Sequence, residues 1–270
     1  MKILFISLGC DKNLADSEEM LGLLTGNGHE IVDSEEEADA IVINTCCFIH
    51  DAKEESVNTI LEMAEYKKTG TCKILIVTGC MAQRYKEEIT EEIPEVDAVL
   101  GTTSYGDIVK ALNEAEAGHV FQEFKDINAL PEDSGRRVIT TGGHFGYLKI
   151  AEGCDKHCTY CIIPSLRGKF RSVPEERLLK QAEYMASQGV RELILVAQET
   201  TVYGTDLYGK KTMHILLKKL CQIKGIRWIR VLYCYPEEIY DELIQVMKEE
   251  KKICHYLDLP IQHASDRILK

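Results

Sequence analysis

The densest group of reactive side chains in the sequence is a run of three cysteines, Cys154, Cys158 and Cys161, spaced as C-x3-C-x2-C. The run follows an apolar, strand-like segment at 145–151. Three thiolates on one short loop can bind three irons of a four-iron, four-sulfur cluster. Because the loop has no fourth cysteine, the fourth iron would stay open to a small chelating molecule, as a catalytic metal keeps an open position. The spacing therefore predicts a [4Fe-4S] cluster with one open coordination site.

A zinc site, a closed ferredoxin cluster and buried free cysteines are the alternatives for this loop. A structural zinc site takes four ligands, commonly as two separated C-x2-C pairs. A ferredoxin cluster is closed by cysteines in a C-x2-C-x2-C run. Free cysteines can also be buried as small hydrophobic residues, but Asp155, Lys156 and His157 between these cysteines favour a loop. The open cluster fits the spacing better than these alternatives.

The length and composition of the chain limit the classes of protein to which it can belong. The chain has 270 residues, enough for one large domain or two smaller ones, and 45% of them are hydrophobic. It has no run of 18 apolar residues, which excludes a predicted membrane span, and its first residues are typical of a strand and lack the features of a secretory signal. We therefore expect a cytoplasmic protein without membrane contact. In that compartment, eleven cysteines favour metal binding or catalysis over disulfides.

Charge is distributed unevenly along the chain. Residues 1–140 contain 12 Lys and Arg against 28 Asp and Glu, a net charge of -16, whereas residues 141–270 have a net charge of +4. An acidic first half repels a phosphate backbone and suits a basic protein partner. A solvated acidic surface without a partner would give the same composition, so charge alone does not choose between these interpretations.

Residues 1–120 are predicted to form a domain with an open parallel α/β sheet. Short apolar runs rich in β-branched residues are typical of strands buried on both faces. Strands that alternate with amphipathic helices form parallel sheets. The predicted strands are 3–6, 40–43, 74–77 and 96–100, and the predicted helices are 15–25, 52–68, 84–92 and 106–117.

Three further cysteines, Cys10, Cys46 and Cys80, each lie a few residues beyond one of the predicted strands. In an open parallel sheet the carboxyl ends of the strands share one edge, where ligands bind. These cysteines are therefore expected to converge as ligands of a second cluster with one open iron, although unrelated buried cysteines at turns remain an alternative. Cys47 could compete as a ligand, but its side chain should point in a different direction. The cysteines treated as non-ligands are Cys47, Cys72, Cys221, Cys234 and Cys254.

Residues 121–143 interrupt the pattern and are predicted to be a linker. From 144 to 270, strands and helices alternate again, which predicts part of a (β/α) barrel with its active site at the carboxyl ends of the strands. The three-cysteine loop follows the first of these strands and Gln198 follows the second, so both face the predicted mouth. The predicted strands are 145–151, 192–197, 226–232 and 256–259, and the predicted helices are 174–187, 213–221 and 236–248.

The three-cysteine loop resembles the signature loop of the radical S-adenosylmethionine (SAM) enzymes. Together with the cysteine motifs of the first domain, and in the same order, it resembles the radical SAM methylthiotransferases over nearly the whole chain. Within that family the sequence motifs are similar to those of the enzymes that modify an aspartate of a small-subunit ribosomal protein. The segments that carry the resemblance are 7–18, 44–49, 52–56, 78–80, 154–161, 197–204 and 206–209.

The resemblance implies two [4Fe-4S] clusters, with SAM bound at the open iron of the loop cluster. It also implies that Tyr160, the aromatic residue before the last cysteine of the loop, lies near SAM. Arg167, in the basic stretch 164–171, could bind the SAM carboxylate through two hydrogen bonds, or the stretch could be a solvated basic loop. Gln198, at the predicted mouth, is the third candidate for a SAM contact. The implied cluster ligands are Cys154, Cys158 and Cys161 for the first cluster and Cys10, Cys46 and Cys80 for the second.

The reaction implied by the resemblance puts a methylthio group at the β-carbon of an aspartate in a small-subunit ribosomal protein. Side-chain bases cannot remove such a hydrogen near neutral pH, whereas a cofactor-derived radical can. An electron donor such as flavodoxin or ferredoxin would be a second partner. One alternative is methylthiolation of an isopentenyl-adenosine in tRNA, against which the acidic first half argues. The other is a non-catalytic iron–sulfur electron carrier, whose clusters would be closed.

Members of the family continue with the remaining barrel strands and a small C-terminal β-barrel, the TRAM domain, which grips the substrate. This sequence ends at Lys270, in a segment that is typical of the start of a helix. We therefore expect a chain that is truncated at its C-terminus, without those strands and without that domain.

Overall fold

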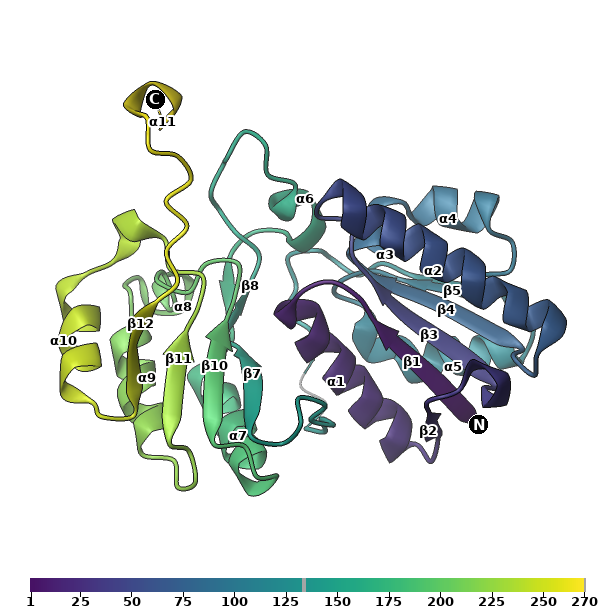
Figure 1. Ribbon diagram of the computed structural model, residues 1–270, viewed down its shortest axis with the longest axis horizontal. Helices are drawn as coiled ribbons and strands as arrows, with labels where there is room; N and C mark the ends of the chain where they lie inside the picture. Colours follow the sequence, from purple (N-terminus) through teal and green to yellow (C-terminus); the bar gives the residue numbers. More distant parts are fainter. Residues whose placement is uncertain (133–134, 270) are drawn as a thin grey trace. The chain divides into compact units, whose positions relative to one another are not determined.

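The computed structural model describes residues 1–132 and 135–269, which divide into two compact units (Figure 1). The first unit comprises Met1–Val138 and Lys156–Lys169, and the second comprises Ile139–Asp155 and Phe170–Lys270. The end of the cysteine loop and the basic stretch after it therefore belong to the first unit, although they follow the first strand of the second in sequence. Within the described residues, no helix is long and apolar enough to cross a bilayer.

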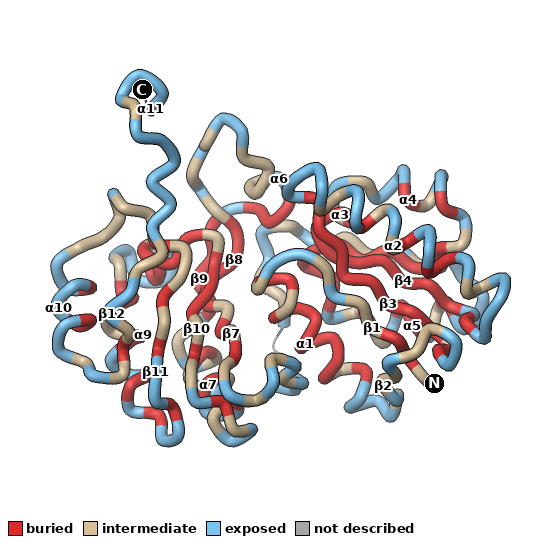
Figure 2. The backbone as a smooth tube through the Cα atoms, viewed as in Figure 1, coloured by how far each residue is buried: buried red, intermediate tan, exposed pale blue. Residues whose placement is uncertain are grey.

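The first unit is built on a six-stranded sheet in the order β2-β1-β3-β4-β5-β6, in which every neighbouring pair is parallel. The two central strands, β3 and β4, are buried along their whole length (Figure 2), as their apolar, β-branched sequences predict. The strands are β1 (Lys2–Ser7), β2 (Glu30–Val32), β3 (Ala40–Thr45), β4 (Ile74–Gly79), β5 (Ala98–Leu100) and β6 (Phe121–Glu123).

Helices cover both faces of this sheet, and each face has its own hydrophobic core. Ile41 and Ile43 of β3 face the core that includes side chains of α2, α3 and α4, whereas Val42 faces the core that includes side chains of α1 and α5. This alternation along one strand is what a parallel sheet with two buried faces requires. The helices are α1 (Asp11–Gly26), α2 (His50–Thr69), α3 (Cys80–Arg84), α4 (Lys86–Glu92) and α5 (Ile108–Glu116), with short 3-10 turns η1 (Glu35–Glu37) and η2 (Tyr105–Asp107).

Several boundaries in the first unit differ from the sequence prediction. The sequence analysis did not predict β2 and β6, because each has only three residues and lacks a continuous apolar run. Since β6 pairs with β5, the segment at 121–143 begins inside the sheet. Helix α1 begins at Asp11, four residues earlier than predicted. The predicted helix at 84–92 corresponds to α4, which begins at Lys86, and the short helix α3 before it was not predicted.

The second unit contains a four-stranded parallel sheet in the order β12-β11-β10-β7 and an antiparallel pair, β8 and β9. Together with the first unit, this sheet confirms the predicted α/β class with two parallel sheets. The strands are β7 (Phe145–Lys149), β8 (Ala151–Glu152), β9 (Arg171–Ser172), β10 (Glu192–Val196), β11 (Trp228–Val231) and β12 (Ile253–Leu257). The helices of the second unit are α7 (Glu175–Ser187), α8 (Thr205–Tyr208), α9 (Met213–Cys221), α10 (Asp241–Glu249) and α11 (Asp266–Leu269), with the 3-10 turn η3 (Pro236–Glu238), and α6 (Ile163–Arg167) lies in the first unit.

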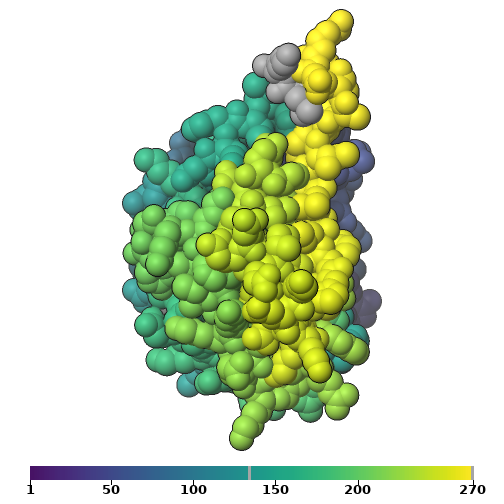
Figure 3. Space-filling view, turned by 90° about the vertical axis from the view of Figure 1, so that its left-hand side faces the viewer, coloured from purple at the N-terminus to yellow at the C-terminus, as the bar shows by residue number. Residues whose placement is uncertain are grey.

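Strand β12 lies at the edge of the second sheet and pairs with β11 alone among the described strands. It begins at Ile253, three residues before the predicted start, because Ile253 pairs with Ile229 of β11. The part of the chain from α10 to β12 faces the viewer in Figure 3, and its exposed apolar side chains include Ile244 and Tyr256. One edge of this sheet is therefore open to a further strand or partner surface.

Glycine is required where the chain leaves β4. Gly79 has φ of 93° and ψ of -158°, a region open almost only to glycine, and a Cβ atom there would lie 2.5 Å from the carbonyl oxygen of Thr45. We expect Gly79→Ala to lower the free energy of unfolding by about 3 kcal/mol or more, from strain and overlap together.

Gly118→Ala is the matched control for this variant. Gly118 also has a positive φ, of 81°, but nothing lies within 4 Å of its added Cβ. Its cost should be only the conformational one, about 1 kcal/mol. Urea unfolding of both variants measures the difference, and equal losses would show that the contact with Thr45 has no effect.

Candidate metal centres

The register of the first sheet brings the three cysteines of the first domain to one edge. Ser7, Asn44 and Thr78 stand level on β1, β3 and β4, and each precedes a cysteine by two or three residues. Cys10 lies at the N-terminus of α1, Cys46 directly follows β3, and Cys80 is the first residue of α3. The thiols are close enough for Cys10 to affect the pKa values of both other cysteines.

Asn13 connects the loops that carry these cysteines. Its Nδ2 atom donates to the carbonyl oxygens of Leu8, at 3.1 Å, and Thr45, at 2.9 Å. The Nδ2 atom of Asn44 donates back to the carbonyl oxygen of Asn13 and to Oγ of Ser17, both at 2.9 Å. These buried amides satisfy backbone carbonyls that the loops would otherwise leave without partners. They explain polar motif residues that the sequence analysis quoted without a role.

Ser56, on α2, fixes the backbone of Cys46 from the opposite side. Its hydroxyl accepts a hydrogen bond from the Cys46 amide at 3.0 Å and donates to the Cys46 carbonyl oxygen at 2.8 Å. On the other flank, a Cβ atom at Gly9 would lie 3.0 Å from the Cys46 sulfur. The position of this thiol is therefore set by a serine from one motif and a glycine from another.

The chemistry of the donors in this triad fits an iron–sulfur cluster. Burial raises the pKa values of the Cys46 and Cys80 thiols, and the charge of the nearby Arg167 acts in the opposite direction on both. A soft metal centre stabilises such thiols as thiolates. Among the described residues, no three His, Cys, Asp or Glu side chains are grouped as a site for one metal ion. A cluster, which takes one thiolate per iron, spreads its ligands more widely than a single ion does.

Cys47 points away from this triad, as the sequence analysis expected. Its thiol donates to the carbonyl oxygen of Cys80 at 3.3 Å, and its side chain belongs to the hydrophobic core between the sheet and α2. Burial raises the pKa of the Cys47 thiol to about 12. The bond of its thiol to the backbone of Cys80 favours a structural role for Cys47.

The three-cysteine loop spans the division between the units. Cys154 lies in the second unit, and Cys158 and Cys161 lie in the first, each partly exposed. The amide of Cys161 donates to the carbonyl oxygen of Cys158 at 3.0 Å, which forms a tight turn around Tyr160. Tyr160 itself is 73% exposed. The ligand role of these cysteines and the SAM contact of Tyr160 remain predictions.

The stretch after the loop is anchored in the first unit. Leu166 belongs to the same hydrophobic core as Cys47, and its carbonyl oxygen accepts a hydrogen bond from Thr102 at 2.8 Å. The amide of Lys169 donates to Oδ1 of Asn128 at 3.0 Å. Arg167, a predicted SAM contact, is buried in this unit, where its Nη1 atom lies 2.8 Å from Asp16. This position gives no support to a contact between Arg167 and SAM.

Gln198 lies at the carboxyl end of β10 in the second unit, as predicted. Its Nε2 atom donates to Glu152 at 3.0 Å, and Lys149 pairs with the same carboxylate at 2.7 Å. The Oε1 atom of Gln198 is buried and has no hydrogen-bond partner within the described part of the chain. Such an atom is suited to a bound ligand. The sequence analysis missed Glu152, although its place directly before the cysteine loop is a usable signal.

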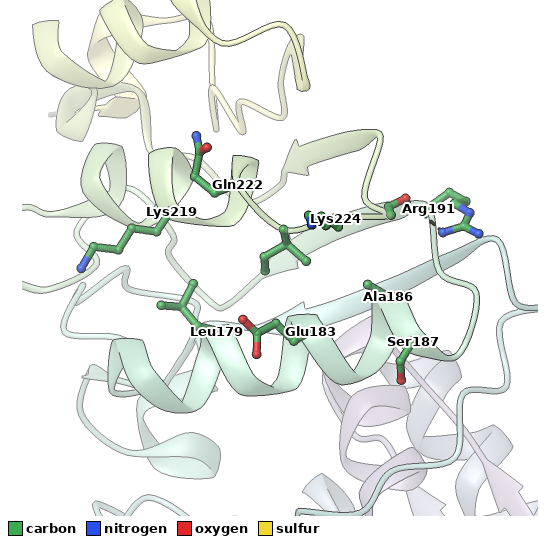
Figure 4. Close-up of a pocket in the computed structure, with 10 residues that line it drawn as sticks. Leu179, Glu183, Ala186, Ser187, Arg191, Lys219, Gln222 and Lys224 are labelled. Carbon is green, nitrogen blue, oxygen red and sulfur yellow. Dashed lines mark hydrogen bonds between the residues drawn. The ribbon is translucent and has the colours of Figure 1, made fainter.

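A hollow of about 740 Å³ lies elsewhere on the second unit, between α7 and α9 (Figure 4). Its lining includes Glu183, Arg191, Lys219 and Gly225. Arg191 and Gly225 precede β10 and β11, so the hollow lies at the amino ends of the strands. In barrels of this kind the chemistry takes place at the carboxyl ends, and none of the predicted site residues lines the hollow.

Two family models match the chain. Residues 2–101 match "Uncharacterized protein family UPF0004", and residues 148–270 match "Radical SAM superfamily". The first match covers the segment with Cys10, Cys46 and Cys80, and the second covers the three-cysteine loop.

Curated relatives match the chain over its full length. It is 67% identical to the ribosomal protein uS12 methylthiotransferase RimO of Lachnoclostridium phytofermentans and 53% identical to the protein of that name from Clostridioides difficile. Each match covers 100% of this chain and 61% of the relative, so the chain spans about three fifths of the length of these relatives.

Solved structures with the same fold are radical SAM enzymes. TsrM from Kitasatospora setae, a radical SAM methyltransferase solved with cobalamin and a [4Fe-4S] cluster, matches with a TM-score of 0.65 and 12% identity over 99% of this chain and 62% of that one. The cobalamin-dependent enzyme OxsB matches with a TM-score of 0.62 and 14% identity over 99% of this chain and 45% of that one. At these identities the likeness concerns the fold alone. By the two family models and the full-length matches, the chain is similar from end to end to the radical SAM methylthiotransferases of the RimO type.

Proposed function

We propose that the protein containing this chain is a methylthiotransferase that acts on an aspartate β-carbon in a small-subunit ribosomal protein. The observation that carries the proposal is the convergence of Cys10, Cys46 and Cys80 at one edge of the first sheet, in a chain that also has a radical SAM loop. We assign the second cluster to the first unit and SAM to the open iron at the three-cysteine loop. A simple electron carrier has no need of a second triad that leaves one iron open.

The similarity to this family implies two [4Fe-4S] clusters and SAM. When bound, they supply the radical chemistry that activates an unreactive C–H bond, which side-chain acids and bases cannot do. The protein's part is to bind and orient the cofactors and the substrate, and to exclude water. Cys154, Cys158 and Cys161 would hold the loop cluster, with Tyr160 beside SAM.

At the mouth of the second sheet, polar side chains would orient SAM. Gln198 is held by its hydrogen bond to Glu152, which is itself fixed by Lys149, so the buried Oε1 atom of Gln198 has a defined direction. An oriented acceptor of this kind suits a hydroxyl or amino group of the ligand. We therefore keep Gln198 as a SAM contact and add Glu152 as the residue that positions it.

The substrate class follows from the relatives and from charge. The matched relatives are named for ribosomal protein uS12, and residues 1–140 have a net charge of -16. An acidic domain attracts Lys- and Arg-rich proteins and repels the tRNA backbone. Flavodoxin or ferredoxin as the electron donor, and the cytoplasm as the place of action, belong to the same proposal.

The first prediction separates the two triads by function. Replacing Cys154, Cys158 and Cys161 with alanine should abolish reductive cleavage of SAM, because the open iron is lost. Replacing Cys10, Cys46 and Cys80 should spare that cleavage and abolish sulfur insertion. Chromatography of 5′-deoxyadenosine and mass spectrometry of the substrate measure the two activities. Loss of cleavage in the second variant, with its loop cluster still intact, would refute the assignment.

The second prediction compares neighbouring cysteines. After anaerobic reconstitution, the unchanged chain should bind about eight irons, four per cluster. Cys46→Ala should lower the iron content toward four, whereas Cys47→Ala should leave it near eight, because the Cys47 thiol lies in the hydrophobic core. Iron and sulfide assays give the counts, and circular dichroism checks that both variants fold. Equal iron contents in the two variants would contradict the assignment of Cys46.

The third prediction concerns the substrate and uses the full-length protein. When it is offered both a ribosomal protein substrate and a tRNA with isopentenyl-adenosine, SCH3 should replace H only on an aspartate side chain. Peptide and nucleoside mass spectrometry from the same reaction read out both products. Modification of the tRNA alone would assign the protein to the tRNA-modifying branch.

A further inference from the structure

Arg167 lies beside the triad of the first unit, far in sequence from the residues that surround it. Its Nη1 atom is 2.8 Å from Asp16, and the two side chains are only 3% and 5% exposed. Its Nη2 atom donates to Oδ1 of Asn13, the amide that connects the cysteine loops. The same Oδ1 atom also accepts from the Cys80 thiol, at 3.8 Å from its sulfur, so the guanidinium and this sulfur share one acceptor.

A buried guanidinium needs a reason beyond packing. Ion pairs at such sites lose so much hydration that apolar residues of similar volume are often equally stable or more so. Yet the chain brings Arg167 into place with Leu166, which is anchored in the core and by Thr102. Through Asn13, whose Oδ1 atom accepts from both Arg167 and the Cys80 thiol, the guanidinium is held next to one of the cysteines of the triad. The position of Arg167 therefore suits a cation that acts on the nearby cysteine sulfurs.

We propose that Arg167 is a positioning residue for the second cluster: Asp16 and Asn13 hold its guanidinium beside the Cys80 sulfur, where its charge stabilises the reduced cluster. The proposal rests on the proposed function, since it takes Cys10, Cys46 and Cys80 as the ligands. Hydrogen bonds to ligand sulfurs and nearby charge are the means by which proteins set cluster potentials.

The sign of the effect follows from charge. Reduction adds one negative charge to the cluster, which a nearby cation stabilises and a nearby anion destabilises. Arg167→Met should therefore lower the reduction potential, and Asp16→Asn, which removes the counter-charge of Arg167, should raise it. Structural damage alone has no reason to move the potential in opposite directions for the two partners of one ion pair.

The experiment uses chains in which Cys154, Cys158 and Cys161 are alanine, so that the second cluster alone is reconstituted. Redox titration followed by electron paramagnetic resonance gives the potential. In Arg167→Met, the ratio of reduced to oxidised cluster at a fixed potential should fall at least tenfold, which is 59 mV for a one-electron couple. Arg167→Lys keeps the charge and should recover part of that loss, and Asp16→Asn should shift the ratio the other way.

The double variant Asp16→Asn, Arg167→Met removes the pair together and leaves no buried unpaired charge, so it keeps the test open if a single variant fails to fold. Because the Arg167 guanidinium shares an acceptor with the Cys80 thiol, its loss should outweigh that of Asp16 and still lower the potential. The matched control is the double variant Glu18→Gln, Arg137→Met, because Glu18, on the same helix as Asp16, forms another buried ion pair with Arg137. It should lower the thermal unfolding temperature without moving the potential.

An unchanged potential in both Arg167→Met and the double variant, or shifts of the same sign in Arg167→Met and Asp16→Asn, would overturn the role of Arg167. Failure of the proposed function would look different. In that case the parent chain with Arg167 intact would bind no cluster, because Cys10, Cys46 and Cys80 would not be ligands.

Discussion

The parallel register of β1, β3 and β4 is the constraint on which the first unit depends. Backbone hydrogen bonds hold Ser7, Asn44 and Thr78 level, so the loops after these three strands start from one line. A slip of one residue would turn every side chain of a strand to the opposite face and move its loop along the edge. Both faces of β3 and β4 are buried, which makes such a slip costly. The two hydrophobic cores therefore also fix where the cysteines stand.

Buried polar side chains hold the loops that follow these strands in place. Loops that leave a sheet have backbone groups without ladder partners, and here Asn13, Asn44 and Ser56 supply those partners in buried positions. The first turn of α1 is therefore polar on its buried side. This is why hydrophobic periodicity placed the start of the helix four residues too late: the buried polar residues of this turn are a charge, Lys12, and an amide, Asn13.

The sequence was sufficient to predict those features that depend on local patterns and on the order of the strands. The convergence of Cys10, Cys46 and Cys80 followed from their places after apolar runs, and the buried direction of Cys47 followed from its position next to Cys46. The destination of Arg167 could not be predicted, because it depends on the docking of 156–169 against a helix about 150 residues earlier in the chain. The sequence showed no carboxylate near this basic loop, so a carboxylate of the ligand was predicted as the partner of Arg167. In the structure the partner is the carboxylate of Asp16.

The segment 156–169 links the two candidate centres through the chain itself. It carries Cys158 and Cys161, assigned to the loop cluster, and six residues after Cys161 it carries Arg167, beside the other triad. Leu166 and its bond to Thr102 fix this segment in the first unit. The position of Cys158 and Cys161, two proposed loop ligands, therefore depends on the same core that supports the second triad. An arrangement of this kind lets one short stretch of chain set both the ligands of one centre and the charge at the other.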